Sequence, residues 1–208
     1  PAALAGIKLR MPPGDAWQIF VPGLMVQLGL FGTAFVGFGL IAEYRAGVIE
    51  RMRVTPAHRL ALLVGRVARD VVVILVQGIA LTVAAVPFGL RAPVGGVVAA
   101  LVMVGLLGAA LSSLSYTASL ITKREDALAP LLNGVAVPLL LLSGILLPMT
   151  LAPRWLRVLS DANPFKHAVD AVRALFQGET SVSALGWGIV SVVALLAVSL
   201  WLGARTFK

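Results

Sequence analysis

Five long apolar stretches determine what this chain can fold into. They cover residues 19–42, 67–90, 94–121, 127–147 and 184–204. A helix of about 20 apolar residues crosses the hydrocarbon core of a bilayer, and each stretch has that length. Of the 208 residues, 59% are hydrophobic and 12% are charged, whereas soluble domains have about 25% charged residues. The sequence therefore predicts an all-α, polytopic bundle of transmembrane helices that forms one domain over residues 1–208.

Glycine and proline distinguish two of these spans. The first span contains five glycines, and small residues let helices pack closely in lipid. The fourth span contains Pro130 and Pro138, with Pro148 just beyond it. Proline removes a backbone N–H and kinks a helix, so we expect a broken span that other protein groups must support.

Several classes of site are excluded by residue content. The chain has no cysteine, which excludes disulfides and thiolate metal sites. His58 and His167 stand alone, so we expect no metal site and no catalytic pair. No G-x-x-x-x-G-K-[ST] motif is present, so the chain cannot hydrolyse ATP through a P-loop and is not expected to be an enzyme by itself. The net charge of +8 has no compact basic domain around it, which argues against a nucleic acid partner.

The basic residues near the span ends predict an orientation. Lysine and arginine favour the cytoplasmic side of a membrane. If the loop at residues 43–59 is cytoplasmic, that side carries ten of the 17 Lys and Arg residues and the other side seven. The C-terminus is then cytoplasmic and residues 1–16 are external. Four lysines among many Ala, Val, Gly and Arg residues indicate a GC-rich bacterial source, so we expect a multi-pass protein in contact with the lipid of a bacterial plasma membrane.

Charge is concentrated between the first two spans. Residues 43–59 read EYRAGVIERMRVTPAHR and hold two acids, four arginines and a histidine. Tyr44, Val48 and Met52 recur every four residues, which predicts an apolar stripe on a short amphipathic helix that ends at Pro56. Two interpretations stay open: a basic loop that fixes topology and meets anionic lipid, or a docking element for a cytoplasmic partner.

A second amphipathic helix is predicted within residues 148–180. Asn163 is a good N-cap and Pro164 suits the first helical position. The helix is too short to span, so it should lie at the external interface or pack on the bundle, with Asp170 able to pair with Arg173. A shorter segment precedes it, with Trp155 as an interfacial anchor.

Hydroxyl groups line one face of the third span. Ser112, Ser115, Tyr116 and Ser119 recur at helical spacing, and polar groups in lipid turn inward. Contact between helices is one interpretation, and contact with a substrate is the other. Weaker candidates of the same kind are Gln27, Gln77 and Asn133. At the start of the second span, Arg66, Arg69 and Asp70 can snorkel or pair.

In their order and spacing, these features resemble the ABC-2 type permease family, and within it the daunorubicin-resistance-like drug exporters. The pattern E-x-x-x-G-x-x-E-x-x-R-x-T-P is present as Glu43, Gly47, Glu50, Arg53, Thr55 and Pro56. The run LLLLSGILLPM and an N-P…R pattern follow, the latter as Asn163, Pro164 and Arg173. Together these motifs cover most of the chain.

The resemblance implies a permease subunit that forms a homodimer or a heterodimer and works with a separate cytoplasmic ABC ATPase. The loop at 43–59 would be the coupling helix, with contacts from Glu43, Arg45, Gly47, Glu50, Arg51, Arg53, Thr55 and Pro56. Residues 148–180 would be an external, partly re-entrant hairpin. ATP and Mg would bind to the ATPase and not to this chain. Family members have six spans and this sequence has five, so we expect one more span before it.

The expected function is ATP-driven export of a hydrophobic or amphipathic, drug-like or antibiotic-like compound by alternating access. Export of a lipid or a glycan is the alternative within the family. A membrane-embedded assembly subunit without transport is the alternative from another class. An enzyme acting on lipid would need clustered His, Asp or Glu residues at one depth, which the sequence lacks.

Overall fold

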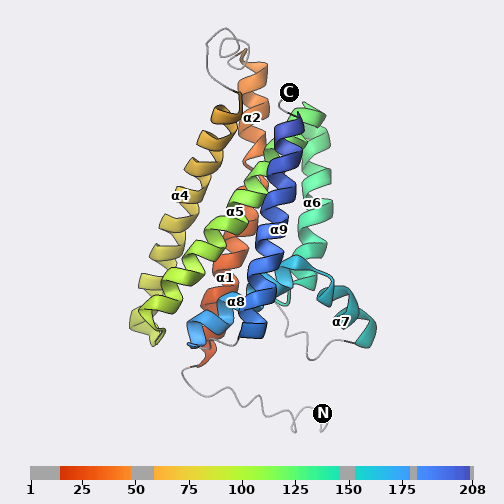
Figure 1. The fold of residues 1–208 in the computed structure, drawn as a ribbon. Coiled ribbons are helices and arrows are strands. Elements are labelled where there is room, and N and C mark those ends of the chain that lie inside the picture. Colours follow the sequence, from red (N-terminus) through yellow and green to blue (C-terminus); the bar gives the residue numbers. More distant parts are fainter. Residues whose placement is uncertain (1–14, 48–58, 146–152, 179–181, 207–208) are drawn as a thin grey trace, which may run out of the picture.

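The structure is a computed structural model that describes residues 15–47, 59–145, 153–178 and 182–206. All elements within these ranges are helical (Figure 1). They are α1 (Asp15–Ala34), α2 (Gly37–Arg45), α4 (Arg59–Ala85), the 3-10 helix η2 (Val86–Phe88), α5 (Val94–Thr122), α6 (Glu125–Leu142), α7 (Arg154–Asp161), α8 (Pro164–Gln177) and α9 (Val182–Thr206). Five segments of this part of the chain are long and apolar enough to cross a membrane, which confirms the predicted all-α, five-span architecture.

Helix α5 lies at the centre of the bundle and packs against α1, α4, α8 and α9. We call the end where α2 ends and α4 begins the loop end, and the end where α7 and α8 lie the hairpin end (Figure 1). Helix α9 ends at the loop end. The end of α2, the start of α4 and the end of α9 thus lie at the same end of the bundle, as the predicted topology requires.

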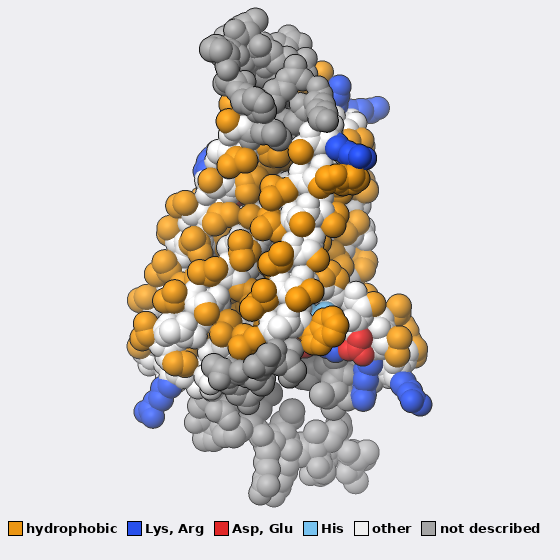
Figure 2. All heavy atoms as spheres, viewed as in Figure 1, with side chains coloured by type: hydrophobic (Ala, Val, Ile, Leu, Met, Phe, Trp, Pro, Cys, Tyr) orange, Lys and Arg blue, Asp and Glu red, His pale blue; other side chains and the backbone are white. Residues whose placement is uncertain are grey.

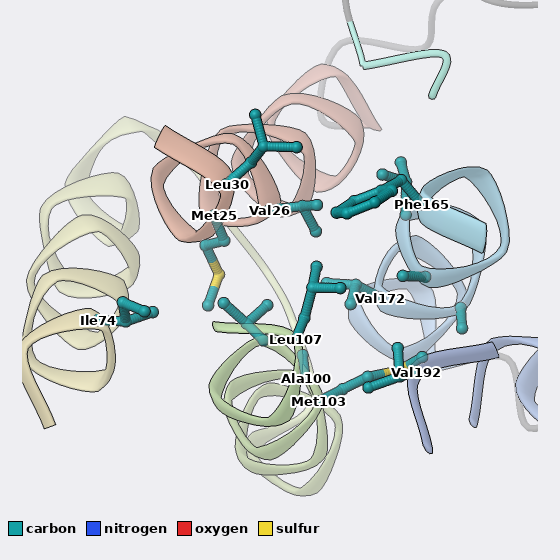
Figure 3. Close-up of a cluster of buried hydrophobic side chains, with 14 of the residues drawn as sticks. Met25, Val26, Leu30, Ile74, Ala100, Met103, Leu107, Phe165, Val172 and Val192 are labelled. Carbon is teal, nitrogen blue, oxygen red and sulfur yellow. The ribbon is translucent and has the colours of Figure 1, made fainter. Parts of the chain in front are cut away.

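The main core fills the half of the bundle nearest the hairpin end. Figure 3 shows labelled side chains from α1, α4, α5, α8 and α9 that meet there. They include Met25 and Leu30 from α1, Leu107 from α5, and Phe165 and Val172 from α8. The apolar face of α8 is therefore buried in the bundle, which is one of the two positions expected for this helix.

The outer surface between the two ends is apolar (Figure 2). On α4, for example, Val72, Val76 and Val83 are 58%, 60% and 63% exposed. Four exposed tryptophans lie near the span ends, where their amphipathic rings suit the bilayer interface. They are Trp17, Trp155 and Trp187 towards the hairpin end and Trp201 towards the loop end.

The first span is interrupted between α1 and α2, although the prolines predicted a break in the fourth span. The Ser115 hydroxyl of α5 donates to the carbonyl oxygen of Ala34 at 2.5 Å and accepts from the N–H of Gly37 at 3.0 Å. One side chain thus supplies partners to both sides of the interruption. A Cβ on Gly37 would lie 2.6 Å from the Ser115 carbonyl oxygen, so only glycine fits there.

The fourth span differs from the prediction in two ways. Helix α6 runs through Pro130 and Pro138 without a break and ends at Leu142, not at residue 147.

The second span also begins earlier than predicted, because α4 starts at Arg59 and not at residue 67. Residues 60–65 are apolar, but the arginines Arg66 and Arg69 follow them, so the predicted span began after Arg66.

The hairpin end of α6 is capped by side chains from α7, α8 and the turn between them. The last four carbonyls of a helix lack partners within it. Asn163 Nδ2 donates to the Leu139 carbonyl at 3.0 Å, and Ser160 Oγ donates to the Leu142 carbonyl at 2.7 Å. Arg173 donates to the Gly144 carbonyl at 3.2 Å, where a cation also suits the negative end of the helix dipole. The hairpin therefore satisfies carbonyl groups that lipid could not.

Asn163 and Pro164 confirm the predicted start of α8. The Asn163 side-chain oxygen accepts from the Phe165 N–H at 3.0 Å, and Pro164 is the first helical residue. The expected Asp170–Arg173 ion pair is wrong: these two described side chains form none, because the guanidinium turns to Gly144. Burial lowers the pKa of Arg173, and the nearby Asp170 carboxylate opposes that shift.

A first prediction concerns the contact at the interruption. Replacing Gly37 with alanine forces a methyl group against Ser115, and overpacking of this kind costs about 1–3 kcal/mol. We expect a lower melting temperature in detergent. The matched control is Gly39→Ala in the same helix, where a Cβ meets no atom within 4 Å. Equal melting temperatures for the two variants would contradict this account.

A second prediction separates the two bonds of Asn163. Asn163→Asp keeps the oxygen that caps α8 but loses the donor to Leu139, and Asn163→Ala loses both. An N-cap contributes about 0.5–2 kcal/mol and an unpaired buried carbonyl costs about 1–3 kcal/mol. We therefore expect melting temperatures in the order wild type, Asn163→Asp, Asn163→Ala. An aspartate variant as stable as wild type would show that the bond to α6 is unimportant.

Candidate functional site

Helix α2 ends at the start of the segment predicted to dock a partner. Its last residue is Arg45, and Gly47 has a left-handed φ of +70°, a conformation that favours glycine. Because the helix stops there, Tyr44 belongs to the end of the first span. The predicted apolar stripe of Tyr44, Val48 and Met52 on a single helix is therefore wrong in its first member.

Two ion pairs fix the chain on either side of this segment. Arg66 of α4 pairs with Glu43 of α2, and the Arg66 side chain is 21% exposed. Arg45 of α2 lies 3.3 Å from Glu125 at the start of α6, where both side chains are about half exposed. An exposed pair of this kind contributes about 0–1 kcal/mol, so the Arg66–Glu43 pair is the stronger of the two.

The turn between α5 and α6 lies against the same place. Lys123 ends α5 with a left-handed φ of 51°, and its ammonium group lies 5.5 Å from the centre of the Tyr44 ring. Glu125 and Asp126 occupy the first turn of α6, where acids suit the helix dipole. The end of α2 thus contacts α4, α5 and α6 together.

The remaining residues of the predicted docking motif lie outside the described part of the chain. They are Glu50, Arg51, Arg53, Thr55 and Pro56. Of the eight predicted contact residues, the structure places Glu43, Arg45 and Gly47. Glu43 and Arg45 are engaged with neighbouring helices, so within this chain they position the segment.

The predicted pathway hydroxyls of α5 are buried and bonded. Ser112, Ser115 and Ser119 are 0%, 1% and 2% exposed. Ser112 and Ser119 donate to carbonyls of their own helix, and Ser115 bridges α1 and α2. Tyr116 donates to Asp70 of α4 at 2.6 Å. These contacts favour the interhelical interpretation, and the role of these residues in a pathway stays a prediction.

Two further pathway candidates lie on other helices. Gln27 of α1 is half-buried, and Asn133 of α6 is exposed and donates to the Ala129 carbonyl of its own helix at 3.0 Å. The Asp70–Tyr116 bond itself was not predicted from the sequence. The sequence signal that could have indicated this bond is Asp70 itself, a carboxylate near the end of an apolar span.

An apolar cavity of about 440 Å³ lies on another face of α5, between that helix, α8 and α9. Met103 and Val192 are its most buried lining residues, and none of the predicted pathway residues lines it. Its size falls within the 300–1,000 Å³ of small-molecule sites, but it offers no polar group to orient a ligand.

The surface of the hairpin end carries an exposed ion pair. Lys166 donates a hydrogen bond to Asp161, which lowers the pKa of that exposed carboxyl. Within the described residues, no three His, Cys, Asp or Glu side chains come together in a way that could hold a metal ion.

Comparison with known proteins finds similarity to permeases of ABC transporters. The chain is 28% identical over 192 residues to the daunorubicin resistance ABC transporter permease protein DrrB1 of Streptomyces coeruleorubidus, covering 88% of this chain and 68% of that protein. It is 24% identical over 191 residues to the probable doxorubicin resistance ABC transporter permease protein DrrC of Mycobacterium tuberculosis, with shares of 89% and 68%. A putative transport permease of Cyanophora paradoxa is 24% identical over 161 residues, with shares of 76% and 56%. No solved structure matches the chain.

The family model described as "ABC-2 type transporter" matches residues 5–176. Permeases of ABC transporters work with ATPase subunits, and the membrane subunit lacks the ATPase domain. Because the match covers most of the sequence, this multi-pass membrane protein belongs to the ABC-2 type transporter family and is a permease subunit.

Proposed function

We propose that this permease exports a hydrophobic or amphipathic, drug-like compound across a bacterial plasma membrane. The observation that carries the proposal is the similarity to a daunorubicin resistance permease over 88% of the chain and to a probable doxorubicin resistance permease over 89%. The apolar bundle with few charged groups suits such a cargo better than a strongly polar one. The loop end faces the cytoplasm, and α9 leads to a cytoplasmic C-terminus.

ATP energy enters through the segment at residues 43–59. A separate ATPase binds ATP and Mg and docks on this segment, with contacts from Glu50, Arg51 and Arg53. The ion pairs of Glu43 with Arg66 and of Arg45 with Glu125 tie the segment to three spans. A movement of the docked ATPase therefore displaces helices and not only a loop.

Transport follows by alternating access between two copies of this permease, or between this chain and a second permease. Closure of the ATPase subunits on ATP moves the docked segments and switches the membrane dimer from inward-open to outward-open. The cargo must bind the two states with different affinity for export to have a direction. The α7–α8 hairpin remains on the external side as the cap of α6.

A third prediction tests the docking segment. Inside-out vesicles are prepared from bacteria that express this permease with its partner ATPase subunit, and ATP-driven daunorubicin uptake is followed by fluorescence. Glu50→Ala should reduce uptake, and Arg53→Glu should abolish uptake and release the ATPase from the purified complex. The matched control is Arg91→Glu, an exposed arginine at the opposite end of the bundle. Unchanged uptake in the Arg53→Glu vesicles would contradict the docking role.

The same vesicles distinguish the alternative functions. Daunorubicin that stimulates ATP hydrolysis and accumulates inside supports drug export. ATP hydrolysis that responds to a lipid-linked glycan or a fluorescent phospholipid, and not to daunorubicin, would favour the export of lipid or glycan. A bound ATPase without ATP-driven movement of any of these probes would favour an assembly subunit.

A further inference from the structure

A carboxylate lies inside one of the membrane-spanning segments. Asp70 belongs to α4, within the span Ala61–Phe88, and is 9% exposed. An ionisable side chain at this depth is costly unless a partner compensates it, so its presence needs a physical reason.

The partner is Tyr116 on the central helix α5. Its hydroxyl donates to Asp70 Oδ2 at 2.6 Å, and the tyrosine is 5% exposed. Hydrogen bonds to an ionised group are shorter and stronger than neutral ones. Because the bond is short and both groups are shielded, it resists a displacement of α4 relative to α5.

Asp70 is part of a polar row on one side of α4. Arg66 lies one helical turn before it and is close enough to act on its charge, as is Arg69. Arg66 also pairs with Glu43 at the end of α2. Two successive turns of α4 are thus joined by polar contacts to α2 and to α5.

The apolar packing around this row is separate from the main core. Leu40 of α2, Leu63 and Val67 of α4 and Tyr116 of α5 form a small cluster of their own. Further along α4, Val72, Val76 and Val83 face outward and make no core. The part of α4 nearest the loop end is therefore held by one small cluster and two polar contacts.

We propose that Asp70 and Tyr116 are a positioning pair that makes α5 follow the movement of α4 during transport. This rests on the proposed function, in which the ATPase acts on the segment that leads into α4. Helix α5 packs against α1, α8 and α9, so a shift of α5 reaches the rest of the bundle. Without the bond, α5 follows α4 less closely and ATP is hydrolysed with little transport.

The test measures daunorubicin transported per ATP hydrolysed by the permease–ATPase complex in vesicles. Tyr116→Phe should lower this ratio at least tenfold, while the ATPase stays bound. Asp70→Asn should keep most of the ratio, because the amide oxygen still accepts from the tyrosine. The matched control is Thr117→Val, which removes a buried hydroxyl on α5 that bonds to Ser113 of its own helix.

The double variant Asp70→Asn/Tyr116→Phe separates positioning from stability. It removes the hydroxyl without leaving a buried charge unpaired, so its melting temperature should return towards the wild-type value. We expect its ratio to stay as low as that of Tyr116→Phe. A double variant that regains both stability and the transport ratio would overturn the proposal, since the bond would then serve stability alone.

The two proposals fail in different ways. If Arg53→Glu leaves the ATPase bound and uptake unchanged, the docking function is wrong. If Arg53→Glu abolishes uptake but Tyr116→Phe transports as many molecules per ATP as wild type, the docking function stands and only the positioning role is wrong.

Discussion

Every backbone N–H and C=O group in the hydrocarbon needs a partner within the protein, because lipid offers none. The bundle depends on how it meets this requirement where helices stop. Ser115 of α5 serves both sides of the interruption between α1 and α2. Ser160, Asn163 and Arg173 serve the carbonyls at the end of α6. In both places the supporting group comes from a distant part of the sequence, so these bonds also fix which helices are neighbours.

Because these supporting groups come from distant parts of the sequence, some features of the fold could be predicted from the sequence and others could not. The number of spans, the capped start of α8 and its apolar face follow from local spacing, and all were predicted; burial of that face in the bundle was one of two predicted positions. The position of the helix break was not. Proline marks a missing N–H, yet α6 continues through both of its prolines. The first span is interrupted where Gly37 permits close approach and Ser115 supplies bonds, and a pattern in one segment cannot reveal a partner 78 residues away.

The candidate sites divide in the same way. The sequence motif predicted Glu43 and Gly47, and the structure assigns them physical tasks as an ion-pair partner and a left-handed helix end. The sequence did not predict that Arg45 would pair with Glu125, or that Tyr116 would donate a hydrogen bond to Asp70. These are contacts between side chains of different helices. They depend on the rotation of each helix about its axis, which packing of the whole bundle determines.

The position of α8 has a consequence for the route of a transported molecule. Four apolar side chains of this helix occupy the space between the spans at the hairpin end. They are Phe165, which is 2% exposed, and Val169, Val172 and Phe176, which are each 0% exposed. Within the described residues, these side chains fill the axis of the bundle at that end. Under the proposed function, a solute that leaves there would pass beside the bundle, along a boundary with another subunit or with lipid, and the chemistry of that boundary would select what can leave.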